Sequence, residues 1–265
     1  MIAATGQTER VPFTPSHVAA VLPFARTPLL PAGLVIGSMM PDLFYYVPID
    51  IPRNFAHSWL GLVTVDLAFG IALFFAWQLV FRAPVVDFFP QWVRGRMKER
   101  DRMPRTARAI VTFAALLIAS VLLGSLTHVL WDSFTHASGL FGSVPALATV
   151  VGPLPVYTWL QHASTVLGAL ALVAFVLWWR RRTQPGTAAP TRLTRRTRVG
   201  GWLLVGVAGL AVSIYLWFRG MGHGSAPFAN DLVFYVVTVA LAAAALVAVL
   251  LCLIWLWLKP GSLPS

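Results

Sequence analysis

"ARAIVTFAALLIASVLLGSLTHVLWDSFTH", residues 107–136, combines a long apolar run with three potential metal ligands at its end. The apolar part, about 107–131, exceeds the roughly 20 residues that a helix needs to cross the hydrocarbon core of a bilayer. His128, Asp132 and His136 follow at intervals of four residues, in a chain with only 6 histidines. The stretch therefore predicts a membrane-spanning helix that carries metal-ligand chemistry at one end.

The composition of the whole chain points to a membrane protein. Of its 265 residues, 58% are hydrophobic and 11% are charged, which is more apolar surface than a soluble domain of this length can bury. Further apolar runs lie at about 57–81, 156–179, 199–218 and 232–258. A sixth run, about 29–47, is interrupted by prolines and glycines. We expect an all-α, polytopic integral membrane helical bundle with five clear spans.

The net charge of +11 is concentrated in two segments between these runs. Most of the basic residues lie in the loop at about 82–108 and in the linker 180–198. Membrane proteins keep such segments on the cytoplasmic side, so both segments and the C-terminus are expected to be cytoplasmic. This placement explains the charge without nucleic acid. The expected partner is the lipid bilayer.

With the basic segments inside, several candidate ligands fall on the outer face. His57 lies at the outer end of its helix, His128, Asp132 and His136 at the outer end of theirs, and His162 near the outer end of the next. His17 depends on the N-terminal segment. If 29–47 is one span, His17 lies on the cytoplasmic side. If 15–26 and 31–47 form a broken or re-entrant helical hairpin, which Pro28 and Pro31 favour, His17 and Asp42 face outward.

The expected domain organisation follows from these segments. Residues 1–11 are expected to be a disordered lead-in, and residues 12–179 a membrane domain that carries the metal site. The basic linker 180–198 leads to a C-terminal two-helix membrane hairpin, 199–258, and a tail, 259–265. The lone Cys252 lies in the last apolar run, which excludes a disulfide framework or a cysteine-based metal site.

Helical residues four apart lie on one side of the helix, so His128, Asp132 and His136 share a face. Imidazole nitrogen and carboxylate oxygen suit Zn²⁺, and also Mn²⁺ or Fe²⁺. A cluster of solvated interfacial groups is the alternative, and the spacing alone leaves both interpretations open.

Two additional residues are candidates for the site. Arg53 either orients an anionic group or anchors at the interface, and Asp66, inside a span, is either functional or satisfied within the bundle.

A family resemblance rests on the order of several motifs. "PFTPSHVAAVLPF" and "GSMMPDL" resemble an uncharacterised bacterial membrane family, domain-of-unknown-function family 4184. "HSWLG" and "GSLTHVLWDSFTHASG" are similar to the inner-membrane LexA-binding proteins that are classed as metal-dependent hydrolases. Through them the chain resembles, more distantly, the zinc-dependent phospholipase C and single-strand nuclease superfamily. The resemblance covers roughly residues 11–175.

The resemblance implies roles for individual residues. Asp42, His57, His128 and Asp132 match one four-ligand zinc site, and Asp132 matches a ligand that can bridge to a second ion. His17 matches a ligand of that second ion, and His136 a ligand of a third site. The soluble enzymes also use an N-terminal Trp and a late His-x-x-x-Glu, whereas here Val166 lies four residues after His162. One or two ions are therefore expected.

The expected function is a membrane-embedded, metal-dependent, phosphoesterase-like hydrolase. Its substrate would be a phospholipid or other phosphoester at the non-cytoplasmic face of the bacterial inner membrane. The ion would activate a bound water, with Asp132 or Asp42 as the base. Two alternatives stay open, namely a metal-binding protein or transporter and a structural membrane protein with a degenerate site.

Overall fold

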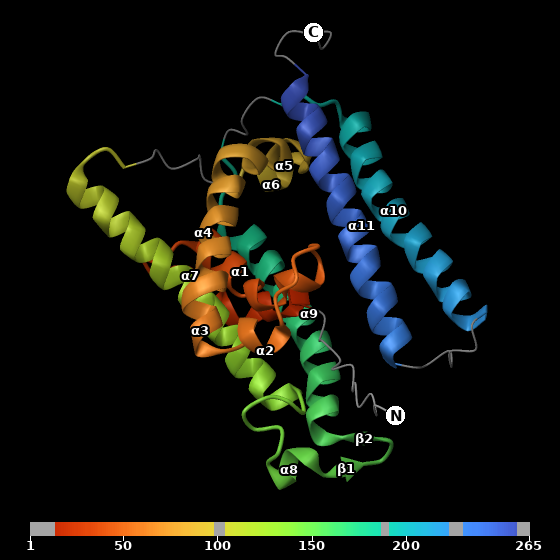
Figure 1. Ribbon diagram of the computed structural model, residues 1–265. Helices are drawn as coiled ribbons and strands as arrows, with labels where there is room; N and C mark the ends of the chain where they lie inside the picture. The colour runs from red at the N-terminus through yellow and green to blue at the C-terminus, as the bar shows by residue number, and fades with distance from the viewer. Residues whose placement is uncertain (1–13, 98–103, 187–190, 223–229, 259–265) are drawn as a thin grey trace. The chain divides into compact units, whose positions relative to one another are not determined.

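The computed structural model describes residues 14–97, 104–186, 191–222 and 230–258. They form two compact units, and Figure 1 labels the helices and strands. The first comprises residues 14–72 and 104–175, and the second comprises 73–97, 176–186, 191–222 and 230–258. The predicted lead-in 1–11 and tail 259–265 lie outside the described residues. The predicted limits of the metal-site domain, 12–179, stay a prediction.

Five long apolar helices confirm the predicted fold class. Each is long and apolar enough to cross a membrane. They are Trp59–Phe88, α7 (Ala107–Thr135), α9 (Val156–Arg182), α10 (Arg195–Gly222) and α11 (Asn230–Trp257). Many of their large apolar side chains are exposed; on α9 the buried residues are Thr158, Gln161 and Gly168. Exposed apolar surfaces of this extent are rare on soluble proteins and suit contact with lipid. Which side each loop occupies stays a prediction.

The first long helix is not uniformly α-helical. It contains α3 (Trp59–Gly61), α4 (Leu67–Ala76) and α5 (Arg82–Phe88), joined by π-helical turns at Leu62–Asp66 and Trp77–Phe81. The hydroxyl of Ser58 begins the helix by accepting from the backbone N–H of Gly61 at 3.0 Å. This capping bond fixes the start of the helix directly after His57.

The shorter elements connect these helices. They are α2 (Arg53–Ala56), α6 (Gln91–Arg94), α8 (Pro145–Ala148), β1 (Val150–Val151) and β2 (Leu154–Pro155). The antiparallel pair β1–β2 is a small departure from the all-α prediction. It turns at Gly152, whose φ of 64° is a conformation that glycine adopts without strain.

The N-terminal segment forms a broken hairpin rather than one span. A 3-10 helix at Thr14–Arg26 is followed by a break and by α1 (Pro31–Gly37), which contacts it. A second 3-10 helix, Met40–Tyr45, comes next. Residues 29–47 therefore do not form one continuous helix, because a proline in the first turn of both later helices interrupts the helix hydrogen-bonding pattern. Re-entrant placement in the membrane stays a prediction.

Small residues allow α1 to lie directly against α7. A Cβ on Gly37 would lie 2.2 Å from the carbonyl oxygen of Val121, and a Cβ on Gly124 would lie 2.4 Å from that of Leu34. The hydroxyl of Ser125 also donates to the carbonyl of Gly37 at 3.0 Å. Backbones this close leave no room for a Cβ, so glycine is needed at both positions. It sets the position of the residues that follow α1.

The second unit is held together at the buried carboxylate of Asp87. Its oxygens accept from the backbone N–H of Arg192 at 3.0 Å, from the indole of Trp255 at 2.8 Å and from the hydroxyl of Thr191. The guanidinium of Arg192 lies 4.3 Å from the centre of the Trp255 ring. The predicted linker 180–198 is thus anchored at 191–192, and it is helical at both ends.

We predict that Gly124→Ala destabilises the protein, because its methyl group would collide with the α1 backbone. Overpacking of this kind costs about 1–3 kcal/mol, so the midpoint of thermal unfolding in detergent should fall. Gly206→Ala on α10 is the matched control, since nothing lies within 4 Å of its Cβ position. Its midpoint should stay or rise, as alanine favours helix over glycine. Equal midpoints for the two variants would contradict the packing argument.

Candidate metal centre

Four candidate ligands from three segments converge in the first unit. His128 and Asp132 lie one turn apart on α7, Asp42 lies in the 3-10 helix Met40–Tyr45, and His57 follows α2. One ligand atom from each lies within 4.8 Å of the others. Asp42 and His128 are fully buried, Asp132 is nearly so, and His57 is largely buried. This group could hold a metal ion.

Backbone carbonyls orient both histidine rings. The Nδ1–H of His128 donates to the carbonyl oxygen of Ser38 at 2.8 Å, and the Nδ1–H of His57 donates to that of Arg53 at 3.1 Å. With Nδ1 engaged, Nε2 of each ring faces the two carboxylates. Neither Nε2 has a hydrogen-bond partner among the described residues. Metal-binding histidines are usually oriented in this way, with the second nitrogen donating to a carbonyl or carboxylate.

The four His–Asp separations suit ligands of a single bound ion. His57 Nε2 lies 3.5 Å from Asp42 Oδ1 and 3.4 Å from Asp132 Oδ2. His128 Nε2 lies 3.5 Å from each of the same two oxygens. Ligands bonded at about 2.0–2.2 Å to a tetrahedral zinc ion are separated by roughly 3.3–3.6 Å. The same separations are long for direct hydrogen bonds, so an ion between the atoms fits them better.

Electrostatics favours a cation in this cluster. Burial by itself would raise the pKa of Asp42, but the neighbouring His128 and His57 outweigh it and hold that pKa well below its ordinary value. Burial would likewise lower the pKa of His57, but its contacts with Asp132 and Asp42 raise it. An ionised carboxylate this deeply buried needs a positive partner. A proton on His57 can supply that charge, and a metal ion can replace the proton.

His17 lies on the other side of Asp132. Its Nε2 is 3.5 Å from Asp132 Oδ1, and its ring stacks on His128 with the ring centres 4.0 Å apart. Burial and the neighbouring His128 lower the pKa of His17 to about 3, so the imidazole is neutral near pH 7. Asp132 therefore faces His57 and His128 with Oδ2 and His17 with Oδ1. This is an arrangement in which one carboxylate can serve two ions.

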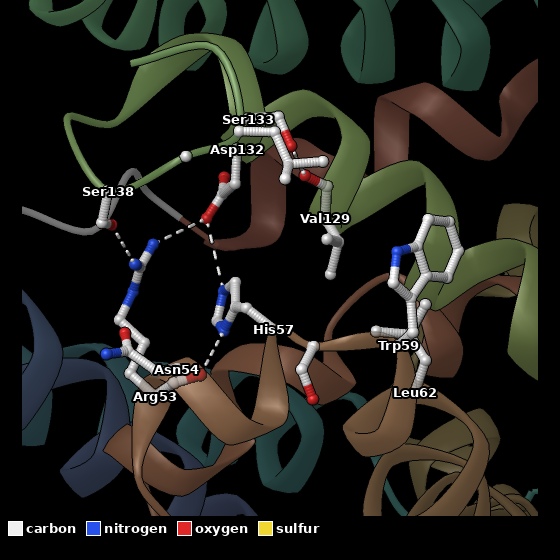
Figure 2. A pocket seen from close by; sticks show the side chains of 12 residues that line it. Arg53, Asn54, His57, Trp59, Leu62, Val129, Asp132, Ser133 and Ser138 are labelled. Atoms are coloured by element: carbon white, nitrogen blue, oxygen red, sulfur yellow. Dashed lines mark hydrogen bonds and ion pairs between the residues drawn. The ribbon is translucent and has the colours of Figure 1, made fainter. Parts of the chain in front are cut away.

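Arg53 connects Asp132 to the loop after α7. Its Nη2–H donates to Asp132 Oδ2 at 3.2 Å, and its Nη1–H donates to the hydroxyl of Ser138 at 2.8 Å (Figure 2). The side chain is 16% exposed. Arg53 therefore contacts the cluster, and both interpretations left open for it, orienting an anionic group and anchoring at the interface, stay predictions.

His136 lies beside the cluster but outside the four-residue group. Its Nδ1 is 3.6 Å from Asp132 Oδ2 and 3.1 Å from the hydroxyl of Thr135. The common helical face expected for the three α7 ligands ends before His136. The helix stops at Thr135, and His136 has extended backbone, with φ −131° and ψ 147°. Its role as a ligand stays a prediction.

The two remaining candidates are not among the grouped ligands. His162 is exposed on α9 and lies outside the grouped ligands. Its candidate role as a ligand stays untested, and the His162→Ala variant below tests our expectation that the centre does not need it. Asp66 is fully buried at the end of the first π-helical turn, and neither of its oxygens has a hydrogen-bond partner among the described residues.

A pocket of about 320 Å³ opens beside the cluster, entirely within the first unit. Figure 2 shows its polar side chains, Arg53, Asp132 and Ser138, apart from the apolar Trp59 and Leu62. Its wall also includes His57, Val129 and Leu140. The metal centre is therefore accessible to a ligand from one side.

The chain has a relationship to one known protein family. The sequence profile of a family described as a domain of unknown function (DUF4184) matches residues 11–254. The chain belongs to the DUF4184 family. The predicted resemblance to this family is confirmed, and the matched region contains all four grouped ligands. No curated protein and no solved structure matches the chain. The resemblance of DUF4184 to the LexA-binding hydrolases and the phospholipase C superfamily stays a prediction.

Some contacts of the DUF4184 site cannot be predicted from the types of residue in the sequence. The carbonyl of Ser38 orients His128, and any residue could supply that carbonyl. Ser138 binds Arg53 across 85 positions of sequence. The one available signal was the sequence "HASG" directly after α7, because its glycine allows a tight turn. A Cβ on Gly139 would lie 2.7 Å from the carbonyl oxygen of Asp132.

We predict that the purified DUF4184 protein contains close to one equivalent or more of a divalent transition metal. His128→Ala and Asp132→Ala should each lower metal affinity by more than about 100-fold, because even residues that only orient ligands contribute 10–100-fold. Elemental analysis after dialysis against a weak chelator measures this. His162→Ala, an exposed histidine, is the matched control and should keep wild-type metal content. Metal-free wild-type protein would contradict the assignment.

We also predict that metal binding releases protons near neutral pH. The raised pKa of His57 means that the ion must displace a proton there, so affinity should fall as pH drops below that pKa. Calorimetric titration with Zn²⁺ in buffers of different ionisation enthalpy counts the protons. His57→Ala should release fewer protons than wild type, and His162→Ala the same number. An unchanged count in His57→Ala would refute this assignment.

Proposed function

We propose that this DUF4184 protein is a metal-dependent hydrolase embedded in the bacterial inner membrane. Its substrate is a phospholipid or other phosphoester, and it acts at the non-cytoplasmic face. The observation that carries the proposal is the close approach of ligand atoms from His57, His128, Asp42 and Asp132, within 4.8 Å of one another, beside an open pocket. A structural ion would need no such access, whereas a catalytic site keeps a route for substrate and water.

Zinc is the metal that the donor set supports best. A set of two imidazole nitrogens and two carboxylate oxygens suits zinc, whereas Mn²⁺ and Mg²⁺ prefer octahedral oxygen-rich sites. Two carboxylates also balance the charge of one divalent ion, which matters in a buried site. His17 and Asp132 Oδ1 are the residues that would hold a second ion. One or two ions are thus supported.

The chemistry divides between the ion and the side chains. A bound zinc ion lowers the pKa of a coordinated water and polarises a phosphoryl oxygen. Arg53 holds Asp132 in place and presents its guanidinium to the pocket, where it can bind an anionic oxygen. In a one-ion site Asp132 Oδ1 is the carboxylate oxygen suited to accept a proton. In a two-ion site that oxygen is a ligand, and Asp42 is the remaining candidate base.

The side of the membrane follows from charge. The basic segments 82–108 and 180–198 are assigned to the cytoplasm, which puts the C-terminal end of α7 on the opposite face. Phosphate headgroups of the outer leaflet lie at that depth. This supports a lipid-linked phosphoester over a cytoplasmic substrate.

Asp66 favours one alternative, transport of the ion. It is fully buried within the span Trp59–Phe88, and neither oxygen has a hydrogen-bond partner among the described residues. Ionisable groups inside membrane spans often mark ion pathways. A transporter would require Asp66 for metal flux, whereas a hydrolase would not require it for metal-dependent turnover.

Hydrolysis by the zinc-loaded protein in lipid nanodiscs tests the proposal. We expect cleavage of bis(p-nitrophenyl) phosphate and of phosphatidylglycerol, with losses of about 100-fold or more in Asp42→Asn and His57→Ala, since each removes an ion ligand. His162→Ala is the control and should retain activity.

Two results would count against hydrolysis. One is a zinc-loaded wild type that cleaves neither substrate, and the other is equal turnover in His57→Ala. Zinc flux into proteoliposomes that Asp66→Asn abolishes, without hydrolysis, would identify the transporter instead.

A further inference from the structure

The pocket beside the metal centre is divided into a polar end and an apolar end. At the polar end, Arg53 reaches between Asp132 and Ser138. At the other end lie Trp59 and Leu62, and Leu140 also lines the pocket. Figure 2 shows Trp59 and Leu62 on the opposite side of His57 from Arg53 and Ser138. A ligand that fills this space needs an anionic group and a hydrocarbon part.

The rim of the pocket is strongly exposed and apolar. Trp59 is 69% exposed and Leu140 is 70% exposed. Leu60 and Val63 extend the exposed apolar face along one span, and Leu130 extends it along α7. Single exposed apolar residues are ordinary, but several of them on the elements that line a pocket indicate contact with an apolar partner.

The loop after α7 keeps that rim in place and carries no charge. Phe141 donates its backbone N–H to the carbonyl of Ser133 at 3.1 Å and stacks on Phe134, with the ring centres 4.6 Å apart. From residue 137 to residue 179 the sequence contains no Asp, Glu, Lys or Arg. In the same loop, Val150 and Val151 are exposed. A loop of this composition between two spans fits the lipid interface better than water.

We propose that this pocket binds an anionic membrane phospholipid that enters sideways from the surrounding leaflet, between Trp59 and Leu140. The guanidinium of Arg53 binds the phosphate, and the apolar end receives the adjoining part of the acyl chains. The inference deepens the proposed function, on which it rests for the choice of substrate. The apolar faces of the span Trp59–Phe88 and of α7 continue from the rim into the bilayer, which makes a lipid rather than a soluble molecule the occupant.

Retention of lipid by the purified zinc-loaded protein tests the inference. Native mass spectrometry after extraction from nanodiscs of equal parts dioleoylphosphatidylglycerol and dioleoylphosphatidylcholine should show preferential retention of phosphatidylglycerol. Arg53→Gln should lower that retention by about tenfold or more, because a charge-assisted contact is lost. Arg181→Gln, an exposed arginine of the second unit, is the matched control and should leave it unchanged.

A second variant and a competitor separate a lipid from a soluble anion. Leu140→Asp places a charge on an exposed position of the rim, so the fold should tolerate it while lipid retention falls. An excess of inorganic phosphate should compete poorly. Equal retention by wild type, Arg53→Gln and Leu140→Asp would overturn the inference. Full competition by phosphate together with wild-type retention in Leu140→Asp would also overturn it, in favour of a site for soluble anions.

The position of the loop can be measured directly. In a Cys252→Ser background, Leu140→Cys labelled with an environment-sensitive dye should be quenched by nitroxide-labelled lipid as strongly as Leu167→Cys on the exposed face of α9. Gln184→Cys, after the end of α9, should be quenched much less. Equal weak quenching at 140 and 184 would place the rim in water and contradict the inference.

These readouts are independent of turnover. A protein that retains phosphatidylglycerol through Arg53 but hydrolyses no phosphoester would keep the inference and refute the proposed hydrolase. A protein that hydrolyses a soluble phosphoester but retains no lipid would do the reverse.

Discussion

Two carboxylates, Asp42 and Asp132, are buried close to the same two histidine nitrogens, and this constraint organises the first unit. Like charges in an apolar interior repel and cannot be relieved by water, so they must be balanced where they lie. The balancing groups come from distant segments, His57 from the start of one span and His128 from the end of another. The N-terminal hairpin, α2 and α7 therefore have to meet at one point, and a divalent ion there would offset both charges.

The geometry of the candidate metal centre depends on a backbone contact of α7 one turn before His128. Gly124 lets the backbone of α1 approach α7, and the position of α1 in turn sets the carbonyl of Ser38. That carbonyl holds the Nδ1–H of His128, which directs Nε2 toward the carboxylates. A glycine one turn before the histidine thus acts on the ligand through a neighbouring helix. In physical terms, this explains why Gly124 and His128 occur four positions apart in "GSLTHVLWDSFTHASG".

Patterns within short stretches of sequence correctly predicted the features that depend on neighbouring residues. The long apolar runs predicted the five helices, and the four-residue spacing correctly placed His128 and Asp132 on one face. The same spacing wrongly placed His136 on that helical face, because the prediction assumed that the helix continues past Thr135. The break before Pro31 was visible in the sequence, but the 3-10 geometry of Thr14–Arg26 was not. The ring orientation of His57, the bond from Arg53 to Ser138 and the pocket arise from contacts between segments far apart in sequence, for which one sequence contains no pattern.

The site joins two environments that are usually kept apart. The metal ligands need a dry, low-dielectric interior that strengthens their interaction with a cation, whereas a phosphate needs hydrogen-bond donors and solvent-like surroundings. Arg53 lies at the boundary, bonded to the buried Asp132 on one side and to the exposed Ser138 on the other. A charged group can stay at such a boundary only if its partners on both sides are fixed, and the tight turn at Gly139 fixes the outer one. Access to the candidate metal centre therefore depends on the loop after α7 as much as on the helices that hold the candidate ligands.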